Sequence, residues 1–536
     1  MANPFLISLF PAGFLLIVKN LFDIQWIYFP LLLSVAFFGA VCLQGAWEKS
    51  KGHVLFLPLE KRAHGIAAVF SLMFFISFSV LSISRFNAFS TEMIDFGNMD
   101  QAVWNTSQGR LLELTSTYYP YENSSRLGFH TEFIYLPFAL AYKVFPEPRL
   151  LFIFQSLFLA ASVFLVFLLS REIVKNDKLA LAVCLVYGLF PALHFMALFD
   201  VHGDVFSVPF LFLAYLLYVK QRPLGHWICL VLALLCKEYV SLAVMGYGLG
   251  LAFFHRDKKN GLAVAGLALA YFFTMMYGII PVFNEGRESM LISDNFEKIG
   301  GQGGLGGMLM YMVMHPAGFF TSMLSGSNFE NLFYLFFPLF FICWYSPVML
   351  LGAIPILLKD MLAGLDIFTH RLAPALPYLA IAFIYGLKKM SQSGGSSPGQ
   401  YRRALRWAPV AAVLVGTYAY GPSPLGHRFW REKSKYTVSH HDKVLKRFVE
   451  KIPETGRVSV SGHIAPYLTH RQYCYVFPRP FDLSRIDFIL LDTLNRKNHS
   501  WDSTDSVRAW IPRVSEFDFI LADSLEGILL YTKEGG

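Results

Sequence analysis

Long apolar runs recur along most of this chain, and they constrain its fold more than any other feature. One of them extends from Ile66 to Ile83 without a single charged side chain. A helix needs about 20 such residues to cross the hydrocarbon core of a bilayer. Of the 536 residues, 55% are hydrophobic and only 15% are charged, whereas soluble domains average about 25% charged residues. The sequence therefore predicts an α-helical polytopic membrane protein.

The apolar runs predict about 11–13 transmembrane helices. The longest interpretation places them near residues 5–22, 26–44, 64–83, 150–170, 179–198, 205–219, 224–236, 239–254, 261–281, 332–346, 347–360, 371–387 and 405–420. Short spans are tolerated where the backbone is buried in protein or lines a cavity. The apolar run 224–254 must be two helices, because otherwise Arg222 and Arg256 would lie on opposite sides of the membrane.

Basic residues gather in short loops between the apolar runs. They are Lys49, Lys51, Lys61 and Arg62; Arg171, Lys175 and Lys178; Lys220 and Arg222; Arg256, Lys258 and Lys259; and Lys388, Lys389, Arg402, Arg403 and Arg406. With about 13 spans and a cytoplasmic N-terminus, every cluster lies on the cytoplasmic side, which is the positive-inside pattern. The net charge of +8 thus reflects topology and does not indicate nucleic-acid binding. The N-terminus, MANPFLISLF, lacks the basic residues of a signal peptide, and we expect a retained helix.

The chain divides into three parts by composition. Residues 1–63 are expected to form an N-terminal helical hairpin with an inner loop, and 64–420 a transmembrane domain with outer segments 84–149 and 282–331. The polar tail, 421–536, alternates short strand-like runs with helical ones and predicts a small extracytoplasmic α/β domain. The expected strands are Arg457–Ser461, Gln472–Phe477, Ile486–Leu491, Phe517–Ala522 and Gly527–Tyr531, with helices near 440–452 and 504–512.

Two features of the outer segments concern their conformation. Glu132 to Phe145 is apolar but short, which favours a helix lying at the membrane interface. Gly300 to Gly307 reads GGQGGLGG, and so many glycines are costly to hold in one backbone conformation. The glycine-rich run is either a disordered loop or a lid that becomes ordered over a bound ligand.

The stretch MIDFGNMDQAVWN, Met93 to Asn105, places two carboxylates next to a membrane helix. If Met99–Gln108 is a helix, Asp95 precedes it and Asp100 lies in its first turn. These aspartates either cap the helix, or one acts as a general base while the other orients it or binds a metal. The neighbouring polar side chains that we expect to line the same cavity are Gln101, Trp104 and Asn105.

A second polar cluster lies in LHFMALFDVHGDVFSVPF, Leu193 to Phe210, at the outer junction of two spans. It contains His194, Asp200, His202 and Asp204. Histidine and aspartate in this density can bind a divalent metal, but their spacing is not a zinc signature. The alternative is that they form the polar lining of a cavity.

Three further polar pairs fall at outer ends of spans: Lys237 with Glu238, His370 with Arg371, and His130 with Glu132. Lys237 is a candidate for binding a phosphate, the alternative being a structural ion pair. Arg371 can make bidentate contacts with phosphate oxygens, or it can act as an interfacial anchor. Under one topology all these clusters face outward. A channel or transporter should instead carry charges near the middle of several spans, so the asymmetry indicates an outward-facing site.

Several of these motifs together resemble the membrane-protein family called domain of unknown function 2079. They are the run from Asp95 to Gln101 with Trp104, Asn105 and Gly109; VHGDVFSVPFLFLAY, Val201 to Tyr215; KEYVSLAVMGYGLGL, Lys237 to Leu251; Val458 to Pro478; and DFILLD, Asp487 to Asp492. Val201 and Tyr239 depart from the family pattern of Phe and Asp at these positions. The resemblance covers residues from about 65 to 532.

The resemblance implies a fold of the GT-C glycosyltransferase type, an outward-facing cavity and a polyprenyl-phosphate sugar donor. It also implies an acidic catalytic residue in the first outer loop, a position that Asp95 matches. Asp100 is a second candidate, and Lys237, Arg371 and Arg110 are candidates for holding the donor phosphate. The expected acceptor is a glycan, a lipid or a protein, and the expected location is the plasma (inner) membrane of a prokaryote. The alternatives are a lipid-linked saccharide flippase and a non-catalytic membrane assembly protein.

Overall fold

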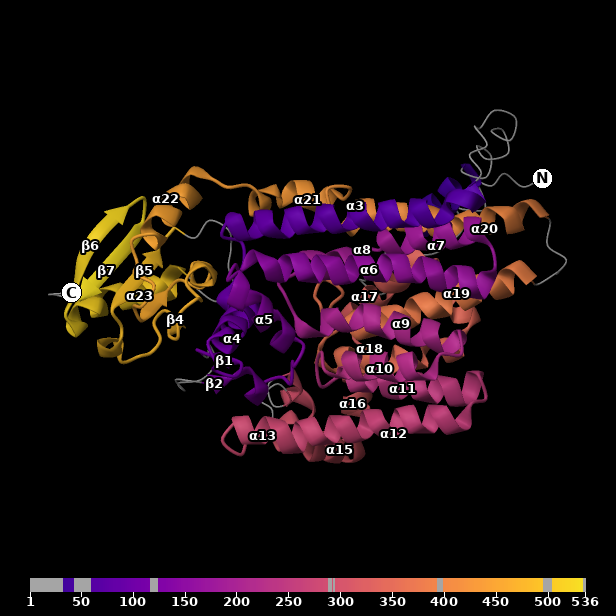
Figure 1. The fold of residues 1–536 in the computed structure, drawn as a ribbon, viewed down its shortest axis with the longest axis horizontal. Helices are drawn as coiled ribbons and strands as arrows, with labels where there is room; N and C mark the ends of the chain where they lie inside the picture. Colours follow the sequence, from indigo (N-terminus) through magenta and orange to yellow (C-terminus); the bar gives the residue numbers. More distant parts are fainter. Residues whose placement is uncertain are drawn as a thin grey trace.

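The long apolar helices pack side by side into a bundle, and a small mixed sheet covers one of its ends. The computed structural model describes residues 32–42, 59–115, 124–287, 292, 295–392, 399–494 and 504–533. In Figure 1 the sheet lies at one end of the molecule, beside the helical bundle. The predicted span 5–22 and the two ends of 26–44 lie outside the described residues, and the described part of the second span, Leu32–Cys42, is helical.

The bundle helices follow the apolar runs closely. They are α3 (Leu59–Asn87), α6 (Arg149–Val174), α7 (Asp177–Gly188), α8 (Pro191–Leu198), α9 (Ser207–Val219), α10 (Pro223–Leu234), α11 (Val240–Phe254), α12 (Lys258–Thr274), α13 (Ile280–Phe283), α15 (Gly304–Met314), α16 (Pro316–Met323), α17 (Gly326–Phe336), α18 (Ile354–Ala363), α19 (Leu376–Gln392) and α20 (Gly399–Tyr420). Among the described residues, three helical stretches are long and apolar enough to cross a membrane, namely Arg62–Asn87, Arg149–Val174 and Lys258–Phe283. The pair α7–α8 becomes a fourth if its 48° bend is counted within one span, and five further apolar helices are shorter.

Breaks in the helices occur where prolines remove a backbone donor. Pro191 begins α8 after the bend, and a π-helical turn, η4 (Met275–Ile279), precedes Pro281 in α13. A proline ring clashes with the carbonyl four residues earlier, so the chain widens or bends there. The resulting short helices are those that end near the candidate site.

The predicted spans 332–346 and 347–360 are wrong as continuous helices. The chain there runs through three 3₁₀ segments, η7 (Phe337–Leu339), η8 (Ile342–Tyr345) and η9 (Pro347–Gly352). Pro338 and Pro347 interrupt the α-helical hydrogen bonds. Phe340 and Phe341 both have positive φ, at 47° and 55°, which an α-helix does not allow.

The predicted hairpin within the run 224–254 is confirmed. Helices α10 and α11 are separated by a turn that carries Lys237 and Glu238. Gly203 of the preceding connection lies against this turn: a Cβ there would be 2.5 Å from the carbonyl oxygen of Cys236 and 2.8 Å from Cγ of Glu132. Only glycine permits this approach, and it brings Lys237 and Asp204 together.

The two expectations for the outer segments have different outcomes. A helix is present within Glu132 to Phe145, as α5 (Tyr135–Val144), and its position at the membrane interface stays a prediction. The glycine-rich run is ordered as a 3₁₀ turn, η6 (Gly301–Gly303), followed by α15. Gly300 and Gly304 adopt positive φ, and the Cα of Gly300 lies so near Gly307 that a Cβ would approach its carbonyl oxygen to 2.6 Å. The glycines therefore allow the backbone at Gly300 to pack directly against the backbone at Gly307.

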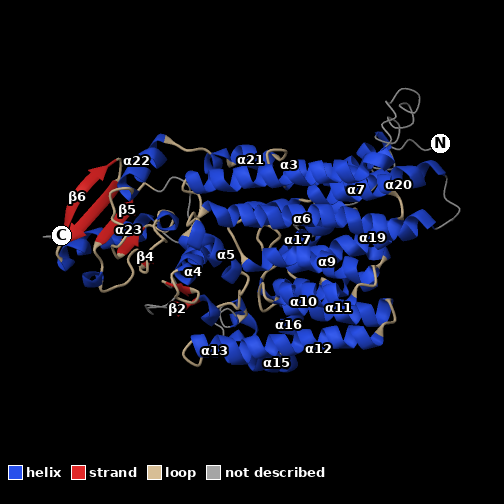
Figure 2. Cartoon of the chain, viewed as in Figure 1, coloured by secondary structure: helices blue, strands red, loops and turns tan. Residues whose placement is uncertain are grey.

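The C-terminal part is an α/β domain, as predicted. Its strands are β3 (Val458–Val460), β4 (Cys474–Val476), β5 (Phe488–Asp492), β6 (Phe519–Leu525) and β7 (Ile528–Lys533), in the order β4-β3-β5-β7-β6. Figure 2 shows these strands in red at the end of the helical bundle. Strand β3 pairs in parallel with β4 and β5, and β7 pairs antiparallel with β5 and β6.

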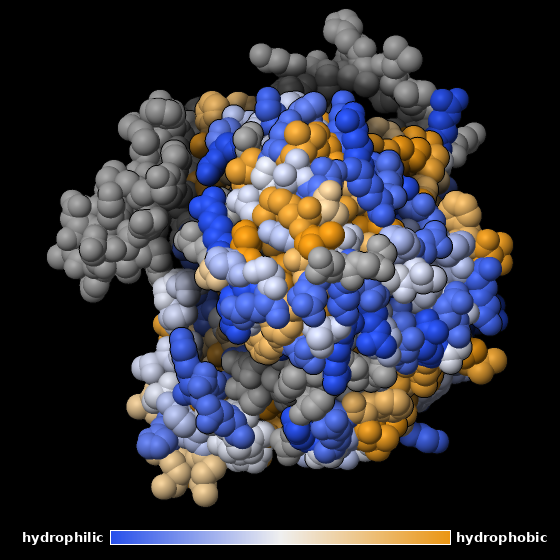
Figure 3. Space-filling model, turned by 90° about the vertical axis from the view of Figure 1, so that its left-hand side faces the viewer, coloured by the Kyte–Doolittle hydropathy of each residue, from blue (hydrophilic) through white to orange (hydrophobic). Residues whose placement is uncertain are grey.

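Helices cover both faces of this sheet. Helix α22 (His440–Val449) packs Val444 and Phe448 against one face, which includes Leu490. Residues of α23 (Thr504–Val514) pack against the other face, which includes Ile489. Because successive residues of β5 point to opposite faces, both are apolar. Figure 3 shows mainly hydrophilic residues, with smaller apolar patches, on the end of the molecule that faces the viewer.

Candidate active site

A single cavity of about 520 Å³ collects seven of the predicted site residues, namely Asp95, His130, His202, Lys237, Glu238, His370 and Arg371. Its walls come from segments far apart in the chain, which meet where the short helices end. The polar lining residues are Asp95, Arg126, His130, His202, Lys237, Glu238, Tyr239, Asn295, Lys359, Asp360, His370 and Arg371. The apolar lining residues are Ile94, Met99, Phe129, Leu242, Phe272, Met276, Ile292, Phe296, Leu305, Met308, Pro355, Leu358, Leu362 and Ala363.

Asp95 is presented to this cavity by a π-helical turn, η1 (Met93–Gly97), which leads directly into α4 (Asn98–Ser107). Its Oδ1 lies 3.5 Å from Nε2 of His202, and its side chain is 35% exposed. Burial favours a higher pKa for Asp95, but the hydrogen bond with His202 and the charge of Arg85 are among the causes that outweigh it. The pKa of Asp95 is therefore below its usual value, and the group is ionised.

Behind the cavity wall, charged side chains form a closed network. Arg126 donates to Glu132 at 2.6 Å, and Lys237 lies 3.3 Å from the other oxygen of that carboxylate. Lys237 also lies 4.0 Å from Oδ1 of Asp204. Burial favours a higher pKa for Glu132, but the two cations outweigh it and lower that pKa to about 2. Charges removed from water are tolerated when paired in this way.

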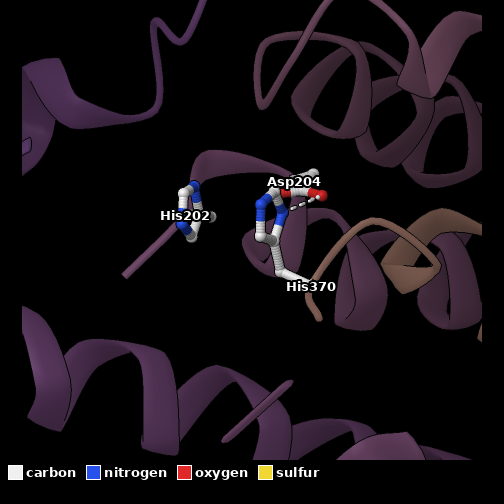
Figure 4. Close-up of side chains that lie close together, drawn as sticks. All are labelled: His202, Asp204 and His370. Atoms are coloured by element: carbon white, nitrogen blue, oxygen red, sulfur yellow. Dashed lines mark hydrogen bonds and ion pairs between the residues drawn. The ribbon is translucent and has the colours of Figure 1, made fainter. Parts of the chain in front are cut away.

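The two histidines at the centre of the site are stacked. The rings of His202 and His370 lie 3.5 Å apart at their centroids, with 8° between their planes. His370 contacts Asp204 through Nδ1 at 2.8 Å, as the dashed line in Figure 4 shows. Tyr239 donates a short hydrogen bond to the same carboxylate. Burial holds the pKa of His370 below its ordinary value, so this ring is neutral at pH 7.

The same three residues form the candidate metal group. Ligand atoms of His202, Asp204 and His370 all lie within 4.8 Å of one another. The stacked rings have nearly parallel planes, so their in-plane lone pairs do not converge on one point. The positive charge of Lys237 beside Asp204 would also repel a bound metal ion. Binding an ion would therefore require at least one ring to turn. The other two predicted ligands lie elsewhere: His194 contacts the carbonyl of Gly188, and Asp200 pairs with Arg85 at 3.1 Å.

His130 and Glu238 form a second pair on the cavity wall. Nδ1 of His130 lies 2.7 Å from Oε1 of Glu238. Burial, with the charges of Lys237 and Arg126, holds the pKa of His130 well below its ordinary value. Burial also raises the pKa of Glu238. Both shifts favour a neutral hydrogen-bonded pair, so this part of the wall contributes little charge.

Two cations face the cavity with fewer constraints. Lys359 pairs with the adjacent Asp360 at 2.6 Å and lies over the ring of Tyr239. In the part of the chain that the structure describes, the guanidinium of Arg371 makes no ion pair with a carboxylate. A fixed positive charge without a partner, beside a wall of apolar side chains, can bind an anionic headgroup whose tail is apolar.

The structure does not bring the remaining predicted residues into the cavity. Asp100 is fully buried and accepts a hydrogen bond from Tyr142 at 2.6 Å. Asn105 accepts from Nε of Arg110 at 2.8 Å, and Arg110 also covers the ring of Trp104. Gln101 donates to the carbonyl oxygen of Arg471 in the C-terminal domain. The expectation that Gln101, Trp104 and Asn105 line the cavity is therefore wrong, and neither Asp100 nor Arg110 lies where it could contact a ligand there. Glu132 stands one layer behind the wall.

Five polar lining residues were not expected from the sequence: Arg126, Tyr239, Asn295, Lys359 and Asp360. Lys359 and Asp360 stand at the end of an apolar run, and charges in such places are costly unless they serve a site. The position of these two charges at the end of an apolar run could therefore have identified them as candidates from the sequence. Arg126 lies in an ordinary polar loop, and nothing in its surrounding sequence distinguishes it.

The fold is that of a polytopic α-helical membrane protein, and comparison with known proteins identifies its relatives. The chain is similar to the crystal structure of ArnT from Cupriavidus metallidurans bound to undecaprenyl phosphate, with a TM-score of 0.50 and 11% sequence identity. The match covers 90% of this chain and 99% of that one. No curated protein sequence matches this chain. The model of a family of predicted membrane proteins, domain of unknown function 2079, matches residues 85–529, and the protein belongs to that family.

Proposed function

We propose that the protein is a membrane glycosyltransferase that moves a sugar from a polyprenyl-phosphate donor to an acceptor hydroxyl on the outer face of the membrane. One observation carries the proposal. The carboxylate of Asp95 and four cationic side chains line one cavity whose remaining wall is apolar. A lipid-phosphate sugar has the matching parts: an apolar chain, one negative charge and a reactive carbon.

Asp95 is the proposed general base. The acceptor hydroxyl donates its proton to a carboxylate oxygen of Asp95 as its own oxygen forms a bond to the anomeric carbon. The bond from that carbon to the phosphate oxygen breaks, and the phosphate leaves with both electrons. The low pKa of Asp95 keeps it ionised and able to accept a hydrogen bond. Proton transfer follows because the hydroxyl becomes acidic as the new bond forms.

The leaving phosphate is stabilised by Arg371 and Lys359. Arg371 has a planar donor pair that fits two phosphate oxygens, and Lys359 adds a point charge. Both line the same cavity as Asp95. Lys237 and Arg126 contribute to the potential from deeper in the wall, where carboxylates hold them in place. Cations arranged in advance around developing charge lower the barrier without reorganising.

The apolar wall is the proposed site for the lipid chain. Phe272, Met276, Phe296, Leu305 and Met308 line it, and the last two come from α15, which begins within the glycine-rich run. This segment is the wall that would have to move for a lipid to enter from the membrane. The structure of ArnT with undecaprenyl phosphate supports a lipid of this class.

The site lies at the end of the bundle that carries the C-terminal domain, because Asp95 stands two residues from the backbone contact between Met93 and Gly462. With the basic loops in the cytoplasm, this end faces outward. A flippase would need polar groups along the whole length of the bundle. The polar residues that line the cavity of about 520 Å³ lie at one end of the bundle instead, which favours a transferase.

The test uses the purified protein in a lipid bilayer with a panel of labelled polyprenyl-phosphate sugars. Free polyprenyl phosphate released on addition of acceptor extracts is measured for the wild type, Asp95→Asn and Asp95→Glu. Release by the wild type, its loss in Asp95→Asn and partial recovery in Asp95→Glu would support the proposal and identify the sugar. Equal binding of donor by all three proteins with no release by any would overturn it.

A further inference from the structure

The C-terminal domain holds the turn that carries Asp95. The amide of Met93, the first residue of η1, donates to the carbonyl oxygen of Gly462 at 3.0 Å. Met93 and Phe89 are also part of the apolar core of the C-terminal domain, together with Ile464 and Leu468. The beginning of η1 is therefore fixed by the backbone and by the core of a domain that lies far away in the sequence.

An aromatic stack fixes the segment just before η1. The ring of Tyr467 lies between Phe86 and Phe89, at 4.4 Å and 4.1 Å from their centroids, with interplanar angles of 18° and 17°. The hydroxyl of Tyr467 donates to the carbonyl oxygen of Phe86 at 2.7 Å. The end of α3 and the approach to η1 are thus held on both faces of one ring.

A polar contact fixes the other end of η1. Asp100, in the first turn of α4, accepts a short hydrogen bond from the hydroxyl of Thr469 and lies 3.2 Å from Nε2 of His470. Gly97, the last residue of η1, lies so close to this segment that a Cβ would be 3.3 Å from Cγ2 of Thr469. The turn that presents Asp95 is therefore held at both ends by the same stretch of chain.

Gln101 connects this contact to the sheet. Its amide nitrogen donates to the carbonyl oxygens of Arg471 and Gln472, at 3.0 Å and 3.2 Å, and its amide oxygen accepts from the backbone of Thr115 at 2.8 Å. The hydroxyl of Thr115 in turn accepts from the amide of Cys474, the first residue of β4. A continuous set of hydrogen bonds thus links α4 to a strand.

We propose that the segment Gly462–Cys474 is a positioning element of the active site. It sets the orientation in which η1 presents Asp95 to His202, and Thr469 acts on Asp95 through Asp100 and η1 without contacting substrate. This inference rests on the proposed function of Asp95. None of the residues that line the cavity belongs to the described part of the C-terminal domain, so the segment Gly462–Cys474 acts on the site through the turn.

The test uses the full-length protein in lipid with Thr469→Val, which keeps the shape and removes the hydroxyl. The matched control is Thr469→Ser, which keeps the hydroxyl. We expect kcat for lipid-phosphate release to fall about 10- to 100-fold in Thr469→Val, with KM for the donor within about two-fold of wild type. Thr469→Ser should recover most of the rate.

A second measurement does not depend on activity. Backbone hydrogen exchange of residues 93–97 should be faster in Thr469→Val than in wild type, while exchange in α12 stays unchanged. His470→Ala, which removes a half-buried partner of Asp100, should act in the same direction. Unchanged exchange in η1 in both variants, or a donor KM that rises as much as kcat falls, would overturn the inference. If the wild type releases no lipid phosphate, the proposed function fails, and the exchange rates alone decide whether this segment holds η1.

Discussion

Two polar regions arise from the same stretch of sequence, and they differ in how far their groups are paired. Asp95 faces the cavity, and its side chain is 35% exposed. In the same cavity, Arg371 has no carboxylate partner in the described part of the chain. Asp100, five positions later, is fully buried and contacts Tyr142, Thr469 and His470. Polar density therefore does not identify an active site. Incomplete pairing in a cavity does, because only such groups remain free to bind a ligand.

The largest expected effect separates these two aspartates. Asp95→Asn should lower the rate of lipid-phosphate release by about 10²–10⁴-fold, the usual contribution of a general base, while the melting temperature stays near that of wild type. Asp100→Asn should lower the melting temperature, since burial leaves its lost hydrogen bonds uncompensated. Both are measured in the same bilayer preparation. Loss of stability in Asp95→Asn, with no loss in Asp100→Asn, would reverse the assignment.

The next comparison is between Lys237, which is paired with two carboxylates, and Arg371, for which the described residues provide no ion pair. Lys237→Ala should destabilise the protein by about 3–5 kcal/mol, because Glu132 and Asp204 would be left buried without their partner. Thermal unfolding measures this loss.

Arg371→Ala should leave the melting temperature unchanged and raise KM for the donor about ten-fold or more, as expected for a lost charged hydrogen bond of about 1.5–3 kcal/mol. Arg371→Lys is the matched control and should recover only part of the affinity, because lysine lacks the paired donors. An equal loss of stability in Arg371→Ala and Lys237→Ala would show that pairing does not distinguish the two cations.

A smaller effect concerns the pH dependence of the site. Contact with His202 contributes to the lowered pKa of Asp95, so the wild type should keep its activity as the pH falls towards about 3.9, the ordinary pKa of an aspartate. His202→Ala removes that contribution and raises the pKa of Asp95, so activity should begin to fall at a higher pH. The pH profile of kcat/KM measures the shift. Identical acid limbs in wild type and variant would contradict the role of His202.

The smallest expected effect lies in the C-terminal domain, where Asp492 contacts His441 and His463. Burial would raise the pKa of Asp492, but hydrogen bonds from both histidines lower it, so this carboxylate stabilises the domain above about pH 3.9 and loses its effect as the pH falls. The hydrogen bond to Asp492 raises the pKa of His441, so the histidine contributes fully below about pH 6.5 and loses its effect as the pH rises. Resistance of the domain to proteolysis should therefore be greatest between about pH 4 and pH 6.5. His441→Asn should flatten the upper part of this profile and move the acid part towards higher pH, because of the two histidines only His463 then lowers the pKa of Asp492.

Local patterns in the sequence predict much of this fold. The hairpin α10–α11 follows from charge placement around one apolar run, and each strand of the C-terminal sheet from a short apolar segment between turn residues. Asp95, His202, Lys237 and Arg371 are predicted as site residues because polar groups at the ends of membrane helices are costly. Those signals are local, and a single sequence contains them.

Three features could not be predicted in this way. Pro338 and Pro347 indicate a break near Phe340, but the positive φ of Phe340 and Phe341 depends on packing that the apolar pattern does not contain. Arg126 takes its importance from Glu132 across a turn, and Asp100 from Thr469, 369 positions away in the chain. Which of two aspartates faces a cavity is decided by such distant partners, and no local pattern contains that information.

The contact between Gln101 and Arg471 spans 370 positions of the chain. A ribosome adds about 5–20 residues per second, so the turn with Asp95 leaves the ribosome roughly 20–75 s before the segment that holds it. Until then, the end of α3 and the beginning of α4 lack their aromatic and polar partners. The turn η1, which carries Asp95, therefore acquires its final geometry as one of the last events of synthesis. A chain that stops before residue 462 contains every residue that lines the cavity but lacks the contacts that orient Asp95.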